Sequence, residues 1–179
     1  MNLGVGGALQ SGFNYAIRHN YEAIVQIDAD GQHPVDAINI LIERANESDA
    51  DIVIGSRFLD EETRMQISMS RRFAMWMLRV VASQACKTTI SDSSSGFRLI
   101  RKPLLGHFAS SFPSHYLGDT FEVLVVCGRK NYKVIEVPAQ FQEREYGQSS
   151  ATSWASILLI FRALVVTTFG LHFQLPKKG

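Results

Sequence analysis

Hydrophobic residues alternate along the chain between helical spacing and short β-branched runs. Helical spacing of apolar residues predicts helices over 9–17, 34–46, 71–85 and 117–128. Short apolar runs rich in β-branched residues predict strands over 23–27, 51–57 and 133–138. Helices that alternate with strands are typical of α/β proteins. We therefore expect an α/β fold over residues 1–150, with a mostly parallel sheet and flanking helices.

The last segment, residues 151–179, differs in character from the rest. Between 154 and 173 nearly every residue is apolar or small, and Arg162 carries the only charge. A membrane-spanning helix needs roughly 20 apolar residues, and an arginine near its centre costs on the order of 3 kcal/mol. Two interpretations stand side by side. The segment is either a helix at the membrane interface, with Lys177 and Lys178 near acidic head groups, or a buried or oligomer-contact helix.

Composition narrows the class of protein. The chain has 179 residues, of which 46% are hydrophobic and 20% charged, enough for one domain with a single core. The formal net charge is +1, so a nucleic-acid partner is disfavoured. Cys86 and Cys127 lie far apart in apolar surroundings without metal-ligand spacing, and we interpret them as buried thiols of a reducing compartment. No secretory signal opens the chain, so we expect a cytoplasmic protein.

Asp28 and Asp30 are the strongest chemical signal. They stand one residue apart where the 23–27 strand is expected to end. Two carboxylates so close repel each other unless a positive charge lies between them, and their oxygens suit a hard divalent cation, Mg²⁺ or Mn²⁺. Gln32 and His33 supply further candidate ligands. The sequence therefore predicts a metal site that includes Asp28, Asp30 and Gln32.

Other interpretations compete for this acidic segment. An EF-hand loop fails, because with Gly31 at its sixth position Ala37 stands at the twelfth, where a glutamate is required. A phosphatase of the haloacid dehalogenase class also carries Asp-x-Asp-Gly after a strand, but it usually has Thr or Val where Gln32 stands, and its downstream lysine and acidic pair cannot be placed. A solvated acidic turn is the structural alternative.

Several blocks in order along the chain resemble family 2 glycosyltransferases. They are NLGVGGA at 2–8, QIDADGQHP at 26–34, GSRF at 55–58, SDSSSGFR at 91–98, and EVP at 136–138 followed by REYGQSS at 144–150. The branch they resemble is that of dolichyl-phosphate mannosyltransferases and bacterial polyprenyl-phosphate glycosyltransferases. This resemblance implies a GT-A fold, a nucleotide-sugar donor, a divalent metal and inversion at the anomeric carbon.

The resemblance also implies roles for single residues. It places Asp28, Asp30 and Gly6 at the nucleotide sugar, with Asp30 as a metal ligand and Gln32 as a further metal contact. A guanidinium group suits phosphate oxygens, which it binds with two parallel hydrogen bonds. The candidate phosphate-binding or acceptor-binding residues are Arg57, Arg71, Arg72, Arg98, Arg144 and Ser149.

Asp92 matches an acid that the resemblance places near the acceptor, and its role depends on the acceptor. A sugar hydroxyl needs a general base, for which Asp92 and Glu122 are the candidates. A lipid phosphate is already an anion at neutral pH and needs orientation, in which case Asp92 positions an arginine such as Arg98. Loop capping by a short polar side chain is the third interpretation.

Family members normally begin with two further strands, one bearing a Pro-x-x-Asn-Glu-like segment and one ending in Asp-Asp-Gly-Ser. Here Met1 stands directly at the NLGVGGA block. We therefore expect an N-terminally truncated GT-A domain with weakened donor affinity and an exposed sheet edge that favours homo-oligomers. The expected reaction transfers a sugar to a polyprenyl (dolichyl-type) phosphate or a related cell-envelope glycan at the inner membrane face. The alternative is a remnant that binds a metal or a partner protein without turnover.

Overall fold

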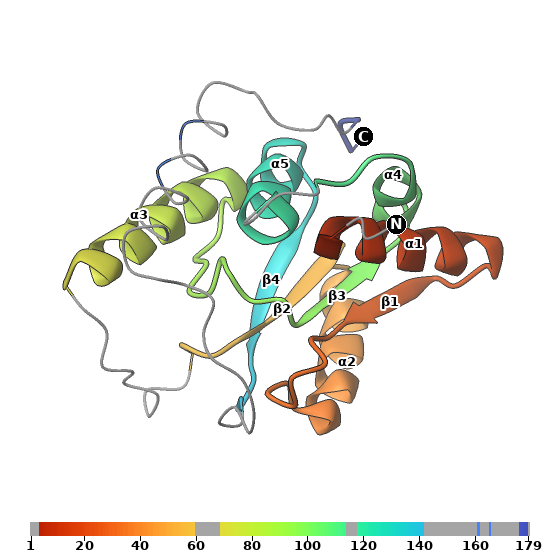
Figure 1. Cartoon of the computed structure of the whole chain (residues 1–179), viewed down its shortest axis with the longest axis horizontal. Helices are drawn as coiled ribbons and strands as arrows, with labels where there is room; N and C mark the ends of the chain where they lie inside the picture. Colours follow the sequence, from red (N-terminus) through yellow and green to blue (C-terminus); the bar gives the residue numbers. More distant parts are fainter. Residues whose placement is uncertain are drawn as a thin grey trace.

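A four-stranded sheet with helices on both faces organises the chain (Figure 1). The structure, a computed structural model, describes residues 4–59, 69–113, 118–141, 161, 165 and 176–178, with the backbone alone for 69–71, 118 and 119. In chain order the elements are α1 Gly4–Arg18, β1 Ala23–Gln26, the 3-10 helix η1 Val35–Ala37, α2 Ile38–Ser48, β2 Ile52–Ser56, α3 Met69–Cys86, β3 Arg98–Arg101, α4 Leu104–Ser110, the π-helical turn η2 Gly118–Glu122, α5 Val123–Arg129 and β4 Val134–Pro138. The predicted α/β fold is confirmed.

The sheet is mixed, with the strand order β1-β3-β2-β4. β3 runs antiparallel to both of its neighbours, so that Leu99 pairs with Val25 on one side and Val53 on the other. β2 and β4 are parallel, with Ile54 opposite Glu136. The expectation of a mostly parallel sheet is therefore wrong for the described strands. The alternation of helices and strands that suggested it carries no information about the direction in which a strand such as β3 enters the sheet.

Strand direction determines which loops meet. β1, β2 and β4 all run the same way, and β3 runs against them. The loops that follow β1, β2 and β4 therefore lie at the same edge of the sheet as the loop that leads into β3. We call this the carboxyl edge.

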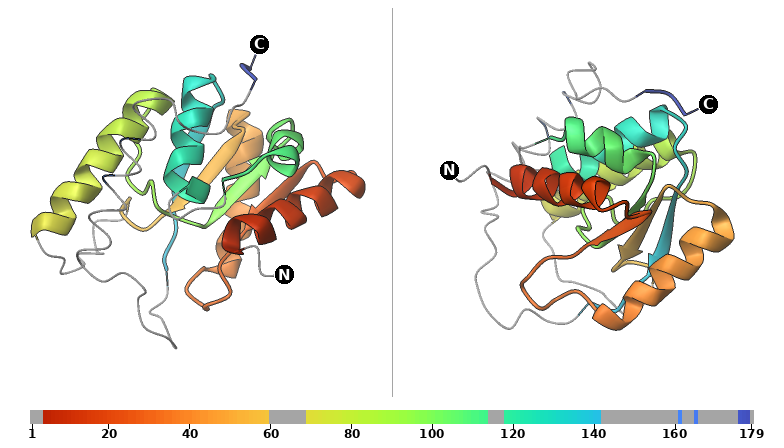
Figure 2. Two further views of the ribbon diagram at one scale, coloured as in Figure 1. Left: turned by 45° about the horizontal axis from the view of Figure 1, so that its top comes forward. Right: turned by 90° about the vertical axis from the view of Figure 1, so that its right-hand side faces the viewer.

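Two apolar cores lie on opposite faces of the sheet. The side chains of a strand alternate between its two faces, and in β2 Ile52 and Ile54 belong to one core while Val53 belongs to the other. The larger core is covered by α1, α3, α4 and α5, and the smaller core by α2 (Figure 2). Burial on both faces explains why the strand over 51–57 reads as a continuous apolar run.

The short helix α4 was not predicted from the sequence. It spans seven residues, Leu104–Ser110, and packs against α1. Leu104, Leu105 and Phe108 are fully buried. Seven residues are too few for the spacing of apolar positions to distinguish a helix from a strand. Tertiary packing therefore decides the conformation of this segment.

α3 and α5 pack so closely that their backbones touch at Gly128. A Cβ at this position would lie 2.6 Å from the backbone of Ala85 and Cys86. The two cysteines are free thiols at this crossing: Cys127 is buried and Cys86 is half-buried, with its Sγ 3.5 Å from the Leu124 carbonyl oxygen. Burial raises the pKa of Cys86 to about 12 and raises that of Cys127, so both remain protonated and apolar.

Replacing Gly128 with alanine should destabilise the protein strongly. The added methyl group overlaps backbone that cannot move without separating α3 from α5, and overpacking of this kind costs about 3 kcal/mol. Urea denaturation measures the loss. Gly12→Ala is the matched control, because nothing lies within 4 Å of a Cβ there and alanine in a helix interior stabilises by about 0.5–1 kcal/mol. Equal effects of the two substitutions would contradict the close packing.

Most of the segment 151–179 lies outside the described residues, as do the expected apolar helix within it and the boundary at residue 150. Among the helices that the structure does describe, none is both long and apolar enough to span a membrane. Lys178 forms an ion pair of 2.8 Å with the buried Asp51, the residue before β2.

Candidate functional site

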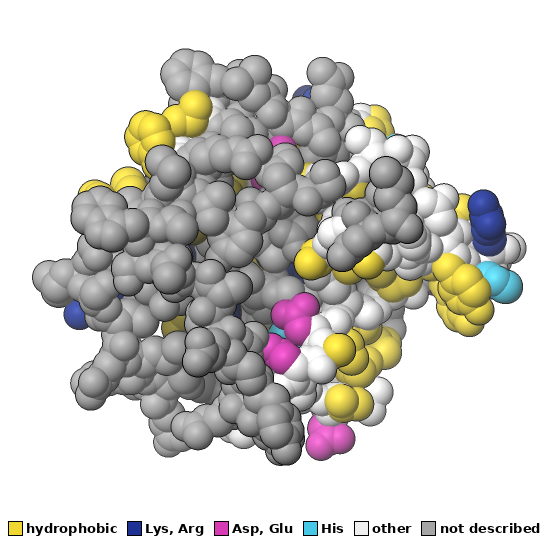
Figure 3. All heavy atoms as spheres, in the orientation of Figure 1, with side chains coloured by type: hydrophobic (Ala, Val, Ile, Leu, Met, Phe, Trp, Pro, Cys, Tyr) yellow, Lys and Arg dark blue, Asp and Glu magenta, His cyan; other side chains and the backbone are white. Residues whose placement is uncertain are grey.

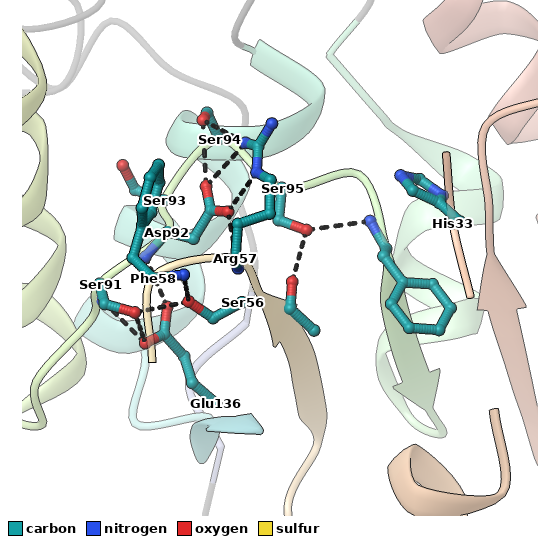
Figure 4. A network of polar contacts seen from close by, with 12 residues as sticks. His33, Ser56, Arg57, Phe58, Ser91, Asp92, Ser93, Ser94, Ser95 and Glu136 are labelled. Carbon is teal, nitrogen blue, oxygen red and sulfur yellow. Dashed lines mark hydrogen bonds and ion pairs between the residues drawn. The ribbon is translucent and has the colours of Figure 1, made fainter. Parts of the chain in front are cut away.

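The candidate site lies at the carboxyl edge of the sheet, where four segments meet. They are the loop after β1 over 27–33, residues 57–59 after β2, the loop over 91–97 that leads into β3, and residues 139–141 after β4. In open α/β sheets, ligands bind outside the carboxyl ends of the strands. Figure 4 shows the polar contacts that join residues 56–58, the 91–97 loop and Glu136 of β4.

Hydrogen bonds hold the acidic loop after β1 in a tight turn. Asp30 Oδ1 accepts from the Gln32 N–H at 3.1 Å, and His33 Nδ1 accepts from the Asp28 N–H at 2.8 Å. Gly31 has a φ of +76°, a backbone conformation that favours glycine. Both carboxylates therefore lie on the turn after β1, which is the strand end at which the sequence located them.

His33 anchors this turn to the rest of the site. Its side chain is only 6% exposed, and its ring packs against Phe97 at 5.3 Å and Phe141 at 5.1 Å between centroids. Burial lowers the pKa of His33 below its ordinary 6.5, although the negative charges of Asp28 and Asp30 oppose this shift. A neutral ring also suits Nδ1 as an acceptor, so His33 holds the loop and carries no charge at neutral pH.

The lowered pKa of His33 predicts that the protein loses stability in mild acid. Unfolded His33 takes up a proton more readily than folded His33, so the free energy of unfolding falls as the pH drops below 6.5. His33→Gln keeps an acceptor oxygen but does not titrate. Between about pH 7 and about pH 5, the free energy of unfolding of His33→Gln should fall less steeply with pH than that of the wild type. The two slopes should differ by up to about 1.4 kcal/mol per pH unit.

Urea denaturation at a series of pH values measures this slope. His19→Gln removes an exposed histidine at the end of α1 and serves as the matched control. Identical slopes for wild type and His33→Gln would show that His33 is not the group responsible.

The acidic loop also contacts the loop over 91–97. The Asp28 carboxylate lies against Gly96, where a Cβ would stand 3.1 Å from Asp28 Oδ2. The charges of Asp28, Asp30, Arg57 and Asp92 all act on the His33 ring. The structure therefore brings the predicted metal ligands and one predicted phosphate-binding arginine to the same place.

Arg57 and Asp92 form a charged pair at the centre of the site. Arg57 Nε donates to Asp92 Oδ2 at 2.8 Å and Nη2 donates to Oδ1 at 3.0 Å. Asp92 is 1% exposed. Burial opposes the charge on Arg57, but the hydrogen bonds and negative charge of Asp92 outweigh it and raise the pKa of Arg57. Arg57 is therefore a permanent cation with a fixed orientation.

The described residues leave one edge of the Arg57 guanidinium without a hydrogen bond. Nη1 makes no hydrogen bond with any part of the chain that the structure describes, and 31% of the side chain is exposed. The guanidinium carbon lies 5.6 Å from the ring centroid of Phe58 and 5.4 Å from that of Phe141. This arrangement leaves a charged donor at the surface of the carboxyl edge.

Arg98 occupies a different place from the one predicted. It is 1% exposed, and its guanidinium donates to the carbonyl oxygens of Ser95 at 2.7 Å, Thr120 at 2.9 Å and Ser93 at 3.3 Å. In one of the three interpretations of Asp92 it positions an arginine such as Arg98, and the arginine that it binds is Arg57. Arg98 therefore shapes the 91–97 loop from inside the protein.

The other predicted residues are placed less centrally. Gly6 is buried in α1, Glu122 is buried at the end of η2, and Arg72 is exposed on α3. The side chain of Arg71, together with Arg144 and Ser149, lies outside the described residues. Glu136 was missed by the sequence reasoning, although its carboxylate binds both Ser91 and Asp92. A charged residue inside the apolar strand pattern over 133–138 is the signal that could have identified it.

The acidic loop has the donor chemistry of a site for a hard cation. Asp28 has 57% of its side chain exposed, and acidic side chains gather at the surface in Figure 3. Within the described ranges, no group of three or more His, Cys, Asp or Glu residues could hold a metal. A pair of carboxylates, Asp28 and Asp30, is nevertheless what Mg²⁺ commonly takes from a protein when phosphate oxygens complete its shell.

A family model and individual relatives of this chain agree on the same class of protein. Residues 1–108 match the family described as Glycosyl transferase family 2. An undecaprenyl-phosphate mannosyltransferase of Micrococcus luteus is 29% identical over 82% of this chain and 60% of its own length. A polyprenol monophosphomannose synthase of Mycolicibacterium smegmatis is 29% identical over 82% of this chain and 55% of its own.

A more distant relative has a different sugar in its name. The UDP-N-acetylglucosamine–dolichyl-phosphate N-acetylglucosaminyltransferase of Methanococcus voltae is 25% identical over 94% of this chain and 67% of its own length. The chain thus spans between about half and two thirds of the length of these relatives.

Proposed function

The chain belongs to glycosyl transferase family 2, and from this membership we propose that it transfers a sugar from a nucleotide sugar to a polyprenyl (dolichyl-type) phosphate, with inversion and with Mg²⁺ or Mn²⁺. The observation that carries this proposal is the meeting of two features at the carboxyl edge. An acidic turn with the exposed Asp28 and the half-buried Asp30 lies near Arg57, a cation whose Nη1 has no hydrogen bond among the described residues. The names of the three relatives, which include undecaprenyl-phosphate, polyprenol and dolichyl-phosphate, support the acceptor class.

Asp28 and Asp30 hold the divalent cation in this proposal. When bound, the cation neutralises the diphosphate that leaves as the bond to the sugar breaks. The hydrogen bonds from Gln32 and to His33 keep the turn in shape without the cation. These hydrogen bonds support a turn whose backbone does not depend on the cation for its conformation.

Arg57 binds the phosphate of the acceptor. Its Nε and Nη2 edge is held by Asp92, and the Nη1 edge is left for phosphate oxygens. The phosphate oxygen attacks the anomeric carbon, the bond from that carbon to the nucleoside diphosphate breaks, and the nucleoside diphosphate leaves. No proton needs to move, because the acceptor is already an anion.

The contacts of Asp92 favour positioning over general-base catalysis. Both of its carboxylate oxygens accept hydrogen bonds from Arg57, and the side chain is shielded from solvent. A carboxylate that must take a proton from a sugar hydroxyl needs to reach that hydroxyl. The arrangement thus supports a lipid phosphate over a sugar hydroxyl as the acceptor. Because a polyprenyl phosphate is held in a membrane, we propose that the reaction takes place at the membrane surface, on its cytoplasmic side.

Donor binding should depend on a divalent metal and on Asp30. We expect wild-type protein to bind labelled GDP-mannose or UDP-N-acetylglucosamine in the presence of Mn²⁺ and to lose that binding with a chelator. Asp30→Ala should weaken it at least about tenfold, because one of two carboxylates is removed from the cation. Asp36→Ala removes an exposed acid of η1 and is the control. Metal-dependent binding that is unchanged in Asp30→Ala would refute the assignment.

The acceptor class can be tested by comparing a short polyprenyl phosphate with the corresponding polyprenol. We expect transfer to the phosphate and none to the alcohol. Arg57→Gln should raise the KM for the phosphate by roughly 10- to 100-fold, the range for a lost hydrogen bond between charged groups. The control is Arg44→Gln, which alters an exposed arginine paired with Glu47 on α2. Comparable transfer to the alcohol would overturn the proposed acceptor.

A further inference from the structure

Glu136 has no part in the proposed reaction, yet it lies at the origin of the contacts that hold Arg57. It is the third residue of β4. Its Oε2 accepts from both the N–H and the Oγ of Ser91 at 2.7 Å, and its Oε1 accepts from the Asp92 N–H at 2.8 Å (Figure 4). One carboxylate thereby fixes the first two residues of the 91–97 loop.

The first route from Glu136 to Arg57 runs through the backbone beside the arginine. Ser91 Oγ gives its one proton to Glu136, so it accepts from Ser56 Oγ at 2.6 Å. Ser56 Oγ in turn accepts from the Phe58 N–H at 3.2 Å. The residues on either side of Arg57 are thus tied to the Glu136 carboxylate.

The second route runs through the side chain of Asp92. Glu136 holds the Asp92 N–H and so sets the direction in which the Asp92 carboxylate points. That carboxylate binds the Arg57 guanidinium through two hydrogen bonds, and Ser94 Oγ contacts both groups. Backbone and guanidinium of Arg57 therefore depend on the same distant anion.

An amide cannot replace the carboxylate at this position. Glu136 offers two acceptor oxygens to three donors, which are the N–H and the Oγ–H of Ser91 and the N–H of Asp92. Glutamine has one acceptor oxygen, and its NH2 group would face an N–H donor. At least one loop N–H or hydroxyl then loses its partner, which releases the start of the loop.

We propose that Glu136 is a positioning residue that, through Ser91 and Asp92, orients Arg57 for a phosphate group. The identity of the phosphate rests on the proposed function, whereas the orientation of Arg57 does not. Two measurements separate these parts.

The first measurement follows the Arg57 Nε–H by NMR in the full chain, with Arg57→Gln to assign the signal. In wild type its hydrogen bond to Asp92 protects this proton from exchange. In Glu136→Gln we expect exchange about tenfold faster or more, with the urea midpoint showing that the protein remains folded. Glu22→Gln removes an exposed carboxylate that pairs with Lys102 at 2.8 Å and should leave the signal unchanged.

Ser91→Ala is a second, milder variant that keeps the test valid if Glu136→Gln does not fold. It removes one donor to Glu136 and the link to Ser56 but keeps both backbone hydrogen bonds. We expect a smaller acceleration of the same exchange. Protection of the Arg57 Nε–H that is unchanged in both variants would overturn the inference, whatever the protein catalyses.

The second measurement is a double-mutant cycle on transfer activity. Glu136→Gln should raise a KM as Arg57→Gln does, with a smaller effect on kcat, and the double variant should match Arg57→Gln alone within about twofold. A KM effect on the polyprenyl phosphate assigns the bound phosphate to the acceptor, and one on the nucleotide sugar assigns it to the donor. Fully additive effects would overturn positioning through Arg57. A wild-type chain without transfer would refute the proposed function and leave the NMR result to decide the role of Glu136.

Discussion

Two charges of opposite sign hold the 91–97 loop, the half-buried Glu136 and the buried Arg98, and the site depends on the shape of this loop. The anion of Glu136 takes the N–H groups at its start, and the cation of Arg98 takes the carbonyl oxygens of Ser93 and Ser95. The positive N–H ends of the peptide dipoles thus face the anion, and the negative carbonyl ends face the cation. A buried charge that loses its partners costs several kcal/mol, so the end of the loop that Arg98 holds cannot open without leaving a buried cation unpaired.

The distribution of charge at the carboxyl edge follows from this arrangement. The charge of Arg57 is matched by Asp92, and His33 is neutral because burial lowers its pKa. Asp28 stands at the surface with more than half of its side chain in solvent. The turn between β1 and η1 therefore adds negative charge beside a neutral pair. A surface of this charge attracts cations and repels anions.

Sequence patterns predicted those parts of the fold whose conformation is determined by the residues of the segment itself. The helical spacing of Phe13 and Ala16 matches the buried side of α1, and the acids at 28 and 30 follow a strand as expected. The direction of β3 and the existence of α4 depend on long-range packing, which leaves no local period. The resemblance marked Arg98 as a functional arginine, but the burial of a side chain is set by tertiary structure. Glu136 was missed because its partners lie about 45 residues away in the chain.

The guanidinium of Arg57 has a plane as well as a charge, and its environment fixes that plane. Two aromatic rings lie next to it, and Asp92 takes the Nε side. Among the described residues, only the Nη1 side of the guanidinium is left without a hydrogen-bond partner. A lysine would bring the same charge without a rim or a preferred approach. An arginine at position 57 therefore fixes the direction of its free N–H donors as well as the charge, and a count of positive charges alone would not reveal this.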